Sequence, residues 1–221
     1  NTNEKLPLKI IGKNLNNSKI IIDIPSAQIK SGLIIAALNT DGESTIIEKN
    51  ITRNHTENMI ESFGANIKIE KKGSDTSIKI IGKKELKSKN IDVPSDLSSS
   101  AFFIVAALIN KGSKISLKNI NINPTRNGIL IALKKMGANI NIKNVRNWSG
   151  EMVGDLDVEY TSLRGCELNK EMSKLMIDEY PILSIAAAFA KGHSLFKGLS
   201  ELRVKESDRL ELIKLNLNKC G

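Results

Sequence analysis

The chain has 221 residues, of which 40% are hydrophobic, and 33 Lys and Arg against 24 Asp and Glu give it a net charge of +9. This length suits one large domain or parts of two, and the apolar fraction excludes wholesale disorder. No apolar run approaches the length of a membrane span, so we expect a cytoplasmic protein without a membrane partner. The cysteines Cys166 and Cys220 and the histidines His55 and His193 are scattered, which favours neither a disulfide framework nor a metal site.

The positive charge suits either small anionic substrates or a nucleic acid, unless it is only solvated surface lysine. The basic residues are spread along the chain, and one tryptophan and two tyrosines offer few rings for stacking on bases. We therefore expect no nucleic-acid partner.

The predicted elements alternate between strands and helices. In chain order the pattern predicts a strand at 19–24, a helix at 27–38, a strand at 44–48, an amphipathic helix at 54–63 and a hairpin of strands at 65–70 and 77–81. The chain therefore contains a β-α-β-α-β-β unit, about 70 residues long, and its fold class is α/β.

Glycines mark three copies of this unit. Gly42, Gly112 and Gly192 each follow a helix of small apolar residues and an Asp or Lys, and they are 70 and 80 residues apart. A second helix in each copy ends near Gly64, Gly137 or Gly221. We expect these glycines to be left-handed C-terminal caps of the helices.

Residues that suit helix N-caps precede the predicted helices, namely Ser26, Asn54, Ser95 or Asp96, and Thr125. Prolines near helix starts, Pro124 and Pro181, fit the same interpretation. If equivalent helices point the same way, their N-termini converge and form a site for anions. For any single cap, the needs of its own helix are the better explanation.

The most highly charged segment, RVKESDR at 203–209, precedes a predicted helix at 210–217. On a helix Lys205 and Arg209 would share a face, and they would repel each other unless an anion or a carboxylate lay between them. Glu206 and Asp208 could do this within a surface ion-pair network, and an anionic substrate could do it within a binding site.

Other candidate residues also stand near helix starts. Asp178 and Glu179 precede an apolar helix at 182–190, where a carboxylate either caps the helix or acts as a general base. Arg53 and Arg126 each lie beside a predicted helix start, where a phosphate or carboxylate would fit.

Five segments, in combination and order, resemble motifs of the 5-enolpyruvylshikimate-3-phosphate synthase family. They are PSAQ at 25–28, TRNHTE at 52–57, NPTRNG at 123–128, MIDEYP at 176–181 and RVKESDR at 203–209. The resemblance covers essentially the whole chain. It implies the enolpyruvyl transferase fold, in which each of two domains has three β-α-β-α-β-β units with helices inside and sheets outside.

The resemblance also implies an activity, transfer of the enolpyruvyl group of phosphoenolpyruvate to the 5-hydroxyl of shikimate 3-phosphate, with no cofactor. Asp178 would be the base for the hydroxyl, Lys205 would contact it, and Glu206 would handle the proton at the methylene carbon. Which of Lys205 and Glu206 carries each proton stays open. Shikimate 3-phosphate would be held by Ser26, Ala27, Gln28, Arg53, Asp178 and Lys205, and phosphoenolpyruvate by Gln28 and Arg209.

Family members also carry a lysine-serine segment, a glycine-rich loop and an Asp-His-Arg motif that this chain lacks. We therefore expect an inactive fragment of a parent that is a monomer. Residues 1–90 would belong to one domain and residues 91–221 to the other, with a crossover near 92–94.

Two rival functions remain. UDP-N-acetylglucosamine enolpyruvyl transferase shares the fold, but its pattern lacks RVKESDR. A non-catalytic anion-binding or RNA-binding protein on the same repeat would suit the basic charge, but Asp178 and Glu206 would repel phosphate chains.

Overall fold

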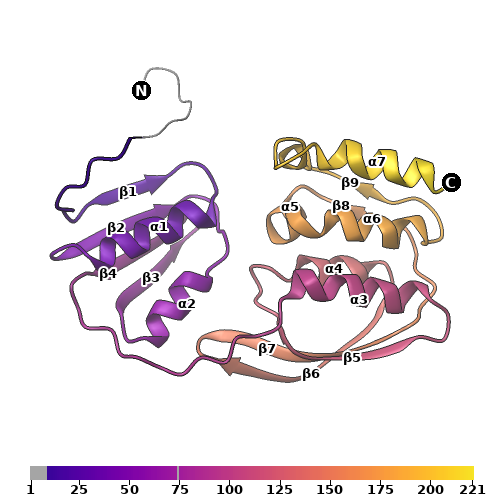
Figure 1. The fold of residues 1–221 in the computed structure, drawn as a ribbon, viewed down its shortest axis with the longest axis horizontal. Helices are drawn as coiled ribbons and strands as arrows, with labels where there is room; N and C mark the ends of the chain where they lie inside the picture. The colour runs from indigo at the N-terminus through magenta and orange to yellow at the C-terminus, as the bar shows by residue number, and fades with distance from the viewer. Residues whose placement is uncertain (1–8, 74) are drawn as a thin grey trace. The chain divides into compact units, whose positions relative to one another are not determined.

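The computed structural model describes residues 9–73 and 75–221, which form two compact units (Figure 1). Unit 1 contains Phe63–Lys87 and the described residues up to Ile51, and unit 2 contains Thr52–Ser62 and Ser88–Gly221. The segment Thr52–Ser62 therefore joins unit 2 although unit 1 flanks it in the sequence. The division into domains at residue 90 stays a prediction, and its first eight residues lie outside the described part.

Unit 1 is a sheet covered by one helix. The sheet has the order β1-β2-β4-β3, in which β1 and β2 are parallel and the other neighbours are antiparallel. Its elements are β1 (Lys19–Ile22), α1 (Ala27–Leu38), β2 (Glu43–Glu48), β3 (Asn66–Lys72) and β4 (Asp75–Ile81). Ile78 and Ile80 alternate with less buried neighbours along β4, so one face of the sheet supplies the core beside Ile34 of α1. The predicted strands and the helix at 27–38 are confirmed.

Unit 2 begins with α2 (His55–Ser62) and then contains the second copy of the repeat. That copy comprises α3 (Leu97–Ile109), β5 (Lys114–Asn121), α4 (Gly128–Lys135), β6 (Asn139–Trp148) and β7 (Glu151–Glu159). The sheet order β5-β7-β6, all antiparallel, repeats the order β2-β4-β3 of unit 1.

The third copy follows in the same unit. Its elements are β8 (Glu167–Leu168), α5 (Glu171–Met176), the 3-10 turn η1 (Ile177–Glu179), α6 (Tyr180–Ala188), β9 (Leu195–Phe196), the 3-10 turn η2 (Ser200–Arg203) and α7 (Arg209–Lys219). The strands β8 and β9 pair in parallel, as β1 and β2 do in the first copy. In the second copy a single parallel bridge between Ser95 and Ile120 takes the place of this strand pair. The predicted repeat is confirmed.

The glycines that mark the repeat adopt the left-handed conformation, with φ between +81° and +86° at Gly42, Gly64, Gly112, Gly137 and Gly192. Their expected role as caps holds directly for Gly137, whose N–H donates to the carbonyl of Lys134 at the end of α4. Gly42, Gly112 and Gly192 instead lie a few residues beyond their helices, in the turn that leads into the next strand.

The predicted N-caps are confirmed for Ser26, which accepts from the N–H of Ile29, and for Asp96, which accepts from the N–H of Ser99. The prediction for Thr125 is wrong, because α4 begins three residues later at Gly128. The side chain of Asn123 accepts from the N–H of Thr125 and so stabilises a turn before the helix.

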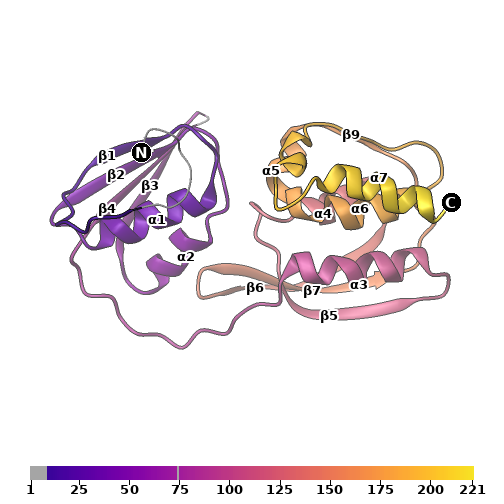
Figure 2. The same cartoon turned by 45° about the horizontal axis from the view of Figure 1, so that its top comes forward.

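The helices α3, α4, α6 and α7 stack on one face of the sheet β5-β7-β6, as the two views in Figures 1 and 2 show. The fully buried core joins this sheet to α3, α4 and α6 through residues such as Ile104, Leu108, Leu133, Leu156 and Leu183. Burial of each such side chain contributes about 1.5–3 kcal/mol. The N-termini of α3 and α6 lie close together, because Ser98 in the first turn of α3 contacts Glu179 directly before α6, and this positions the candidate site.

Candidate functional site

The candidate site lies at the N-termini of three helices in unit 2. The hydroxyl of Ser98 in the first turn of α3 donates to Glu179, directly before α6. Asp178, one residue earlier, contacts Arg209 at the start of α7. The predicted convergence of helix N-termini is thus observed for α3, α6 and α7.

The short 3-10 turn η1 points two consecutive carboxylates in different directions. Glu179 is 3% exposed, and burial raises the pKa of its carboxyl group despite the hydrogen bond from Ser98. The side chain of Asp178 is 33% exposed. Because Glu179 anchors the turn to α3, Asp178 is left to face the charged segment that precedes α7.

Three cations surround Asp178 among the described residues. Its Oδ1 lies 3.2 Å from Nη1 of Arg209 and 3.6 Å from Nζ of Lys205, and its Oδ2 lies 3.5 Å from Nη2 of Arg53. The three side chains are 23–36% exposed. Asp178 balances one of these three positive charges, and Glu201 and Glu206, which contact Lys205 and Arg209, balance the other two.

The expectation that Lys205 and Arg209 share a helix face is wrong. Asp208 accepts from the N–H of Glu211 and caps α7, so the helix begins at Arg209 and Lys205 lies in the preceding bend. The carboxylate between the two cations is Asp178, from a segment far earlier in the sequence, and neither Glu206 nor Asp208.

Acidic neighbours hold the other sides of these cations. Nζ of Lys205 lies 3.0 Å from Glu201, and Nη2 of Arg209 lies 2.5 Å from Glu206. Hydrogen bonds from its own backbone and from Arg209 lower the pKa of Glu206, and the hydrogen bond to Glu206 raises the pKa of Arg209. Glu206 is therefore ionised in this arrangement. The ion pair between Glu201 and Lys205 was not predicted from the sequence, although a spacing of four residues is typical of such pairs.

The two candidate arginines differ in what they contact. Arg53 reaches Asp178, whereas Nη2 of Arg126 lies 2.6 Å from the hydroxyl of Ser98 and 3.3 Å from Asp96. Arg126 thus supports the N-terminus of α3. The sequence predicted a phosphate or carboxylate beside Arg126, and in the structure this place is taken by the carboxylate of Asp96.

The segment 26–28 lies in unit 1, in the first turn of α1. Ser26 is the N-cap, Ala27 is half-buried and Gln28 is exposed. Below them Nζ of Lys30 lies 3.2 Å from Glu48 of β2, in an ion pair whose side chains are 1% and 3% exposed. This pair, which sequence reasoning missed, ties the helix that carries the segment to the sheet.

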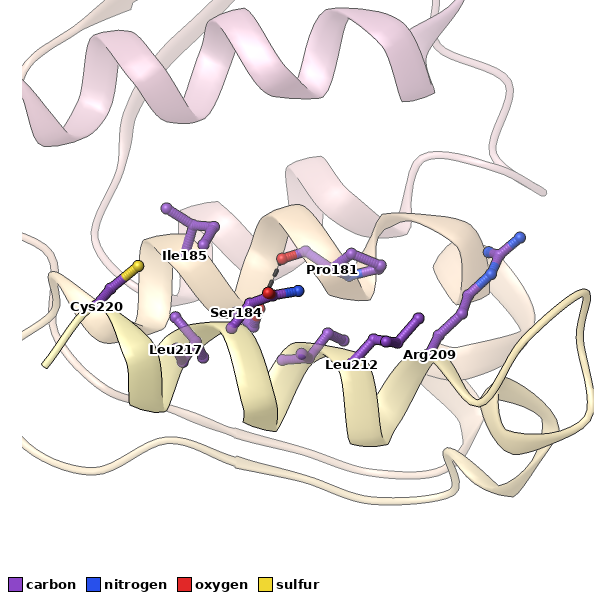
Figure 3. A pocket seen from close by; sticks show the side chains of 9 residues that line it. Pro181, Ser184, Ile185, Arg209, Leu212, Leu217 and Cys220 are labelled. Atoms are coloured by element: carbon purple, nitrogen blue, oxygen red, sulfur yellow. Dashed lines mark hydrogen bonds between the residues drawn. The ribbon is translucent and has the colours of Figure 1, made fainter.

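A groove of about 330 Å³ runs between α6 and α7 (Figure 3). It is mostly apolar, with Pro181, Ile185 and Leu212 among its lining residues, and of the residues around Asp178 described above it includes Arg209. The groove therefore lies beside the charged cluster and lacks its concentration of charge.

Residues 9–73 and 75–221 contain neither a metal-binding cluster nor a membrane-spanning helix. They contain no group of three or more His, Cys, Asp and Glu side chains that could hold a metal ion. None of the helices there is long and apolar enough to cross a membrane.

Known proteins match this chain over essentially its whole length. The family model of EPSP synthase (3-phosphoshikimate 1-carboxyvinyltransferase) matches residues 1–221. The 3-phosphoshikimate 1-carboxyvinyltransferase of Pseudomonas sp. (strain PG2982) is 44% identical over 220 residues, which are 99% of this chain and 49% of that protein. The chain thus spans about half the length of the curated relatives it matches.

Solved structures agree with the family match. EPSP synthase from Acinetobacter baumannii superposes with a TM-score of 0.83 and 39% identity, over 92% of this chain and 45% of that one. The enolpyruvyl transferase NikO from Streptomyces tendae, 18% identical, has a TM-score of 0.57 over 82% of this chain and 44% of that one, and shares the fold. The predicted enolpyruvyl transferase fold is confirmed, and the chain belongs to the EPSP synthase (3-phosphoshikimate 1-carboxyvinyltransferase) family.

Proposed function

We propose that the full-length protein containing this chain transfers the enolpyruvyl group of phosphoenolpyruvate to the 5-hydroxyl of shikimate 3-phosphate and releases phosphate. The observation that carries the proposal is the position of Asp178 among Arg53, Lys205 and Arg209. A carboxylate that can take a proton lies beside three cationic side chains, which can bind anionic reactants.

The reaction needs a base and an acid in turn. Asp178 takes the proton of the 5-hydroxyl as its oxygen bonds to the enol carbon, and a proton is given to the methylene carbon by Lys205, or by Glu206 once that carboxylate has taken up a proton. In the second step the new methyl group loses a proton, the double bond re-forms and the C–O bond to phosphate breaks. The same groups then act in reversed roles, and the cations offset the negative charge of both reactants.

The remaining roles follow the family resemblance. Ser26, Ala27, Gln28 and Arg53 hold shikimate 3-phosphate together with Asp178 and Lys205, while Gln28 and Arg209 hold phosphoenolpyruvate. The exposed side chain of Gln28 and the N-cap position of Ser26 support a binding role for this segment.

The proposal extends to the whole protein. Residues 1–90 and 91–221 are parts of its two domains, it is a cytoplasmic monomer, and its partners are the two anionic substrates. The 221-residue chain by itself is inactive, because it spans about half the length of its relatives.

The test is phosphate release from phosphoenolpyruvate by the full-length protein, with shikimate 3-phosphate or UDP-N-acetylglucosamine supplied separately and the 221-residue chain assayed alongside. We expect release with shikimate 3-phosphate alone, and none from the chain. Release with the UDP-sugar alone would assign the protein to the rival transferase reaction. A folded protein that releases phosphate with neither acceptor would refute the enzymatic function.

A further inference from the structure

The segment Thr52–Ser62 needs an anchor within unit 2. It carries Arg53, which contacts Asp178, yet the residues on either side of it belong to unit 1. The chain therefore enters unit 2 at Thr52 and leaves it after Ser62. The position of Arg53 depends on what holds this short segment.

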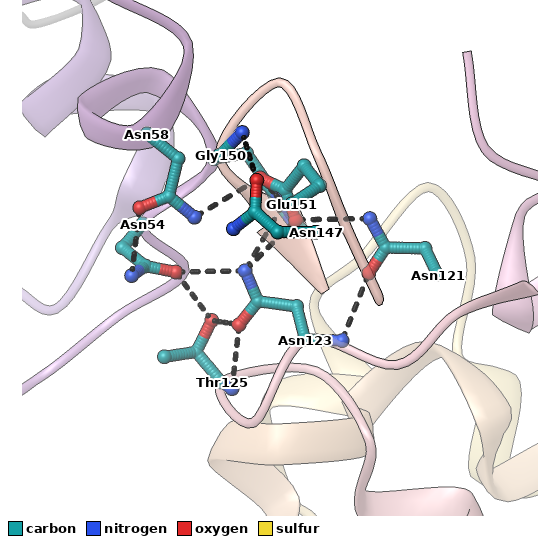
Figure 4. Close-up of polar contacts among 9 residues, drawn as sticks. Asn54, Asn58, Asn121, Asn123, Thr125, Asn147, Gly150 and Glu151 are labelled. Carbon is teal, nitrogen blue, oxygen red and sulfur yellow. Dashed lines mark hydrogen bonds and ion pairs between the residues drawn. The ribbon is translucent and has the colours of Figure 1, made fainter. Parts of the chain in front are cut away.

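The carboxylate of Glu151 forms hydrogen bonds both to the segment Thr52–Ser62 and to neighbouring parts of unit 2. Oε1 of Glu151, the first residue of β7, lies 2.9 Å from Nδ1 of His55 and accepts from Nδ2 of Asn58 at 3.2 Å. Both partners are on α2. Oε2 of Glu151 accepts from Asn121 at 3.0 Å and from Asn123 at 3.1 Å. Glu151 thus ties α2 to the end of β5 and to the loop that follows it (Figure 4).

A second set of contacts reaches the neighbour of Arg53. Oδ1 of Asn54 accepts from Nδ2 of Asn123 at 2.9 Å and from the hydroxyl of Thr125 at 3.2 Å. Asn123 therefore contacts both Glu151 and Asn54 (Figure 4). Because Asn54 directly follows Arg53, these bonds fix the backbone from which the Arg53 side chain extends.

The charge of Glu151 strengthens this anchor. Its side chain is 14% exposed, and burial alone would raise the pKa of the carboxyl group. Hydrogen bonds from His55, Asn121 and Asn123 outweigh burial and lower the pKa to about 2. Hydrogen bonds to an ionised acceptor are roughly twice as strong as those between neutral groups.

The backbone beside Glu151 is shaped for close contact with α2. Gly150 has φ of +90°, and a Cβ atom there would lie 2.7 Å from the carbonyl oxygen of Asn58. The turn between β6 and β7 therefore approaches the helix more closely than a larger residue would allow.

We propose that Glu151 is a positioning residue for Arg53. It holds α2 and the preceding Asn54 in unit 2, so that the guanidinium of Arg53 stays beside Asp178 and can bind the anionic substrate. The expected effect of Glu151 on substrate binding rests on the proposed function. Its effect on the position of the segment Thr52–Ser62 does not.

The first test is the variant Glu151→Gln in the full-length protein. The Gln side chain keeps the shape, but in either orientation its amide nitrogen would face a donor, namely Asn58 on one side or Asn121 and Asn123 on the other. We expect the KM for shikimate 3-phosphate to rise about tenfold, equivalent to about 1.4 kcal/mol, and kcat to change by less than about twofold. Glu159→Gln, at the other end of β7 in an exposed pair with Lys114, is the control and should change neither value.

The double variant separates positioning from a general loss of structure. In an Arg53→Ala background, Glu151→Gln should raise the KM no further, because the residue through which it acts is absent. An unchanged KM in the single variant, or an equal rise in both backgrounds, would overturn the proposal.

A second readout is independent of activity. Hydrogen exchange of the amides in Thr52–Ser62 should become faster in Glu151→Gln, whereas exchange in α3 and α6 should stay as in the wild type. Asn58→Ala, which removes one of the donors, gives a milder test if Glu151→Gln does not fold. If exchange in Thr52–Ser62 becomes faster in Glu151→Gln but the wild-type protein lacks the proposed activity, the proposed function is refuted while the role of Glu151 as an anchor stands. Unchanged exchange in both variants would refute the anchor itself.

Discussion

The buried pair of Lys30 and Glu48 allows a quantitative prediction about unit 1. The substitution Lys30→Met keeps a side chain of similar length in α1, but it removes the ammonium group that lies 3.2 Å from the buried carboxylate of Glu48. Removing one partner of a buried ion pair costs about 3–5 kcal/mol, because the remaining charge is not compensated. We therefore expect the free energy of opening of unit 1 to fall by about that amount.

Hydrogen exchange of the amides in β2 and β4 measures this loss directly. Tyr160, Tyr180 and Trp148 are all in unit 2, so fluorescence would report on the wrong part of the chain. At about 1.4 kcal/mol for each factor of ten, exchange through opening of unit 1 should become roughly 10²- to 10³-fold faster or more.

Two further variants identify the cause. The double variant Lys30→Met with Glu48→Leu should recover most of the loss, because an apolar pair of similar volume replaces the ion pair. Lys49→Met removes an exposed pair with Asp23 and should have no measurable effect. If the double variant is as unstable as Lys30→Met, the loss comes from packing and the reasoning from uncompensated charge is wrong.

Three other predictions concern the site and its anchor. Asp178→Asn and Glu206→Gln should each abolish turnover in the full-length enzyme but leave calorimetric binding of shikimate 3-phosphate little changed, since they remove proton transfer. The pKa of Glu151 is lowered to about 2, so its contribution to stability is present above its unfolded value near 4.5 and is lost as the pH falls towards 2. The difference in urea-unfolding free energy between wild type and Glu151→Gln should therefore shrink over that range. Gly150→Ala should lower the melting temperature, because its Cβ would meet the backbone of Asn58 at a positive φ.

Each of these predictions has a contrary outcome. Turnover that survives both acid substitutions would show that the roles of Asp178 and Glu206 are wrong. If the difference in unfolding free energy between wild type and Glu151→Gln stays constant between pH 5 and pH 2, Glu151 is not held ionised by its hydrogen bonds. A Gly150→Ala variant as stable as the wild type would show that the turn and α2 can separate without cost.

Local sequence patterns determined the elements of this protein. Apolar spacing and the Ser26 cap predicted the helix at 27–38 with the bounds of α1, and alternation predicted the strands of the first unit. The recurring glycines predicted three copies of one unit, and five motifs predicted the family. These signals were readable because spacing, caps and left-handed glycines act over a few residues, which any single stretch of sequence contains.

Only the tertiary structure decided which charged groups meet. It placed Asp178 between Lys205 and Arg209, engaged Arg126 with Asp96, and joined His55 to Glu151 across 96 residues of sequence. In each case a charged or polar side chain is compatible with many partners. The choice follows from how the apolar faces of the helices and sheets pack, because that packing sets which segments lie within hydrogen-bond distance of one another.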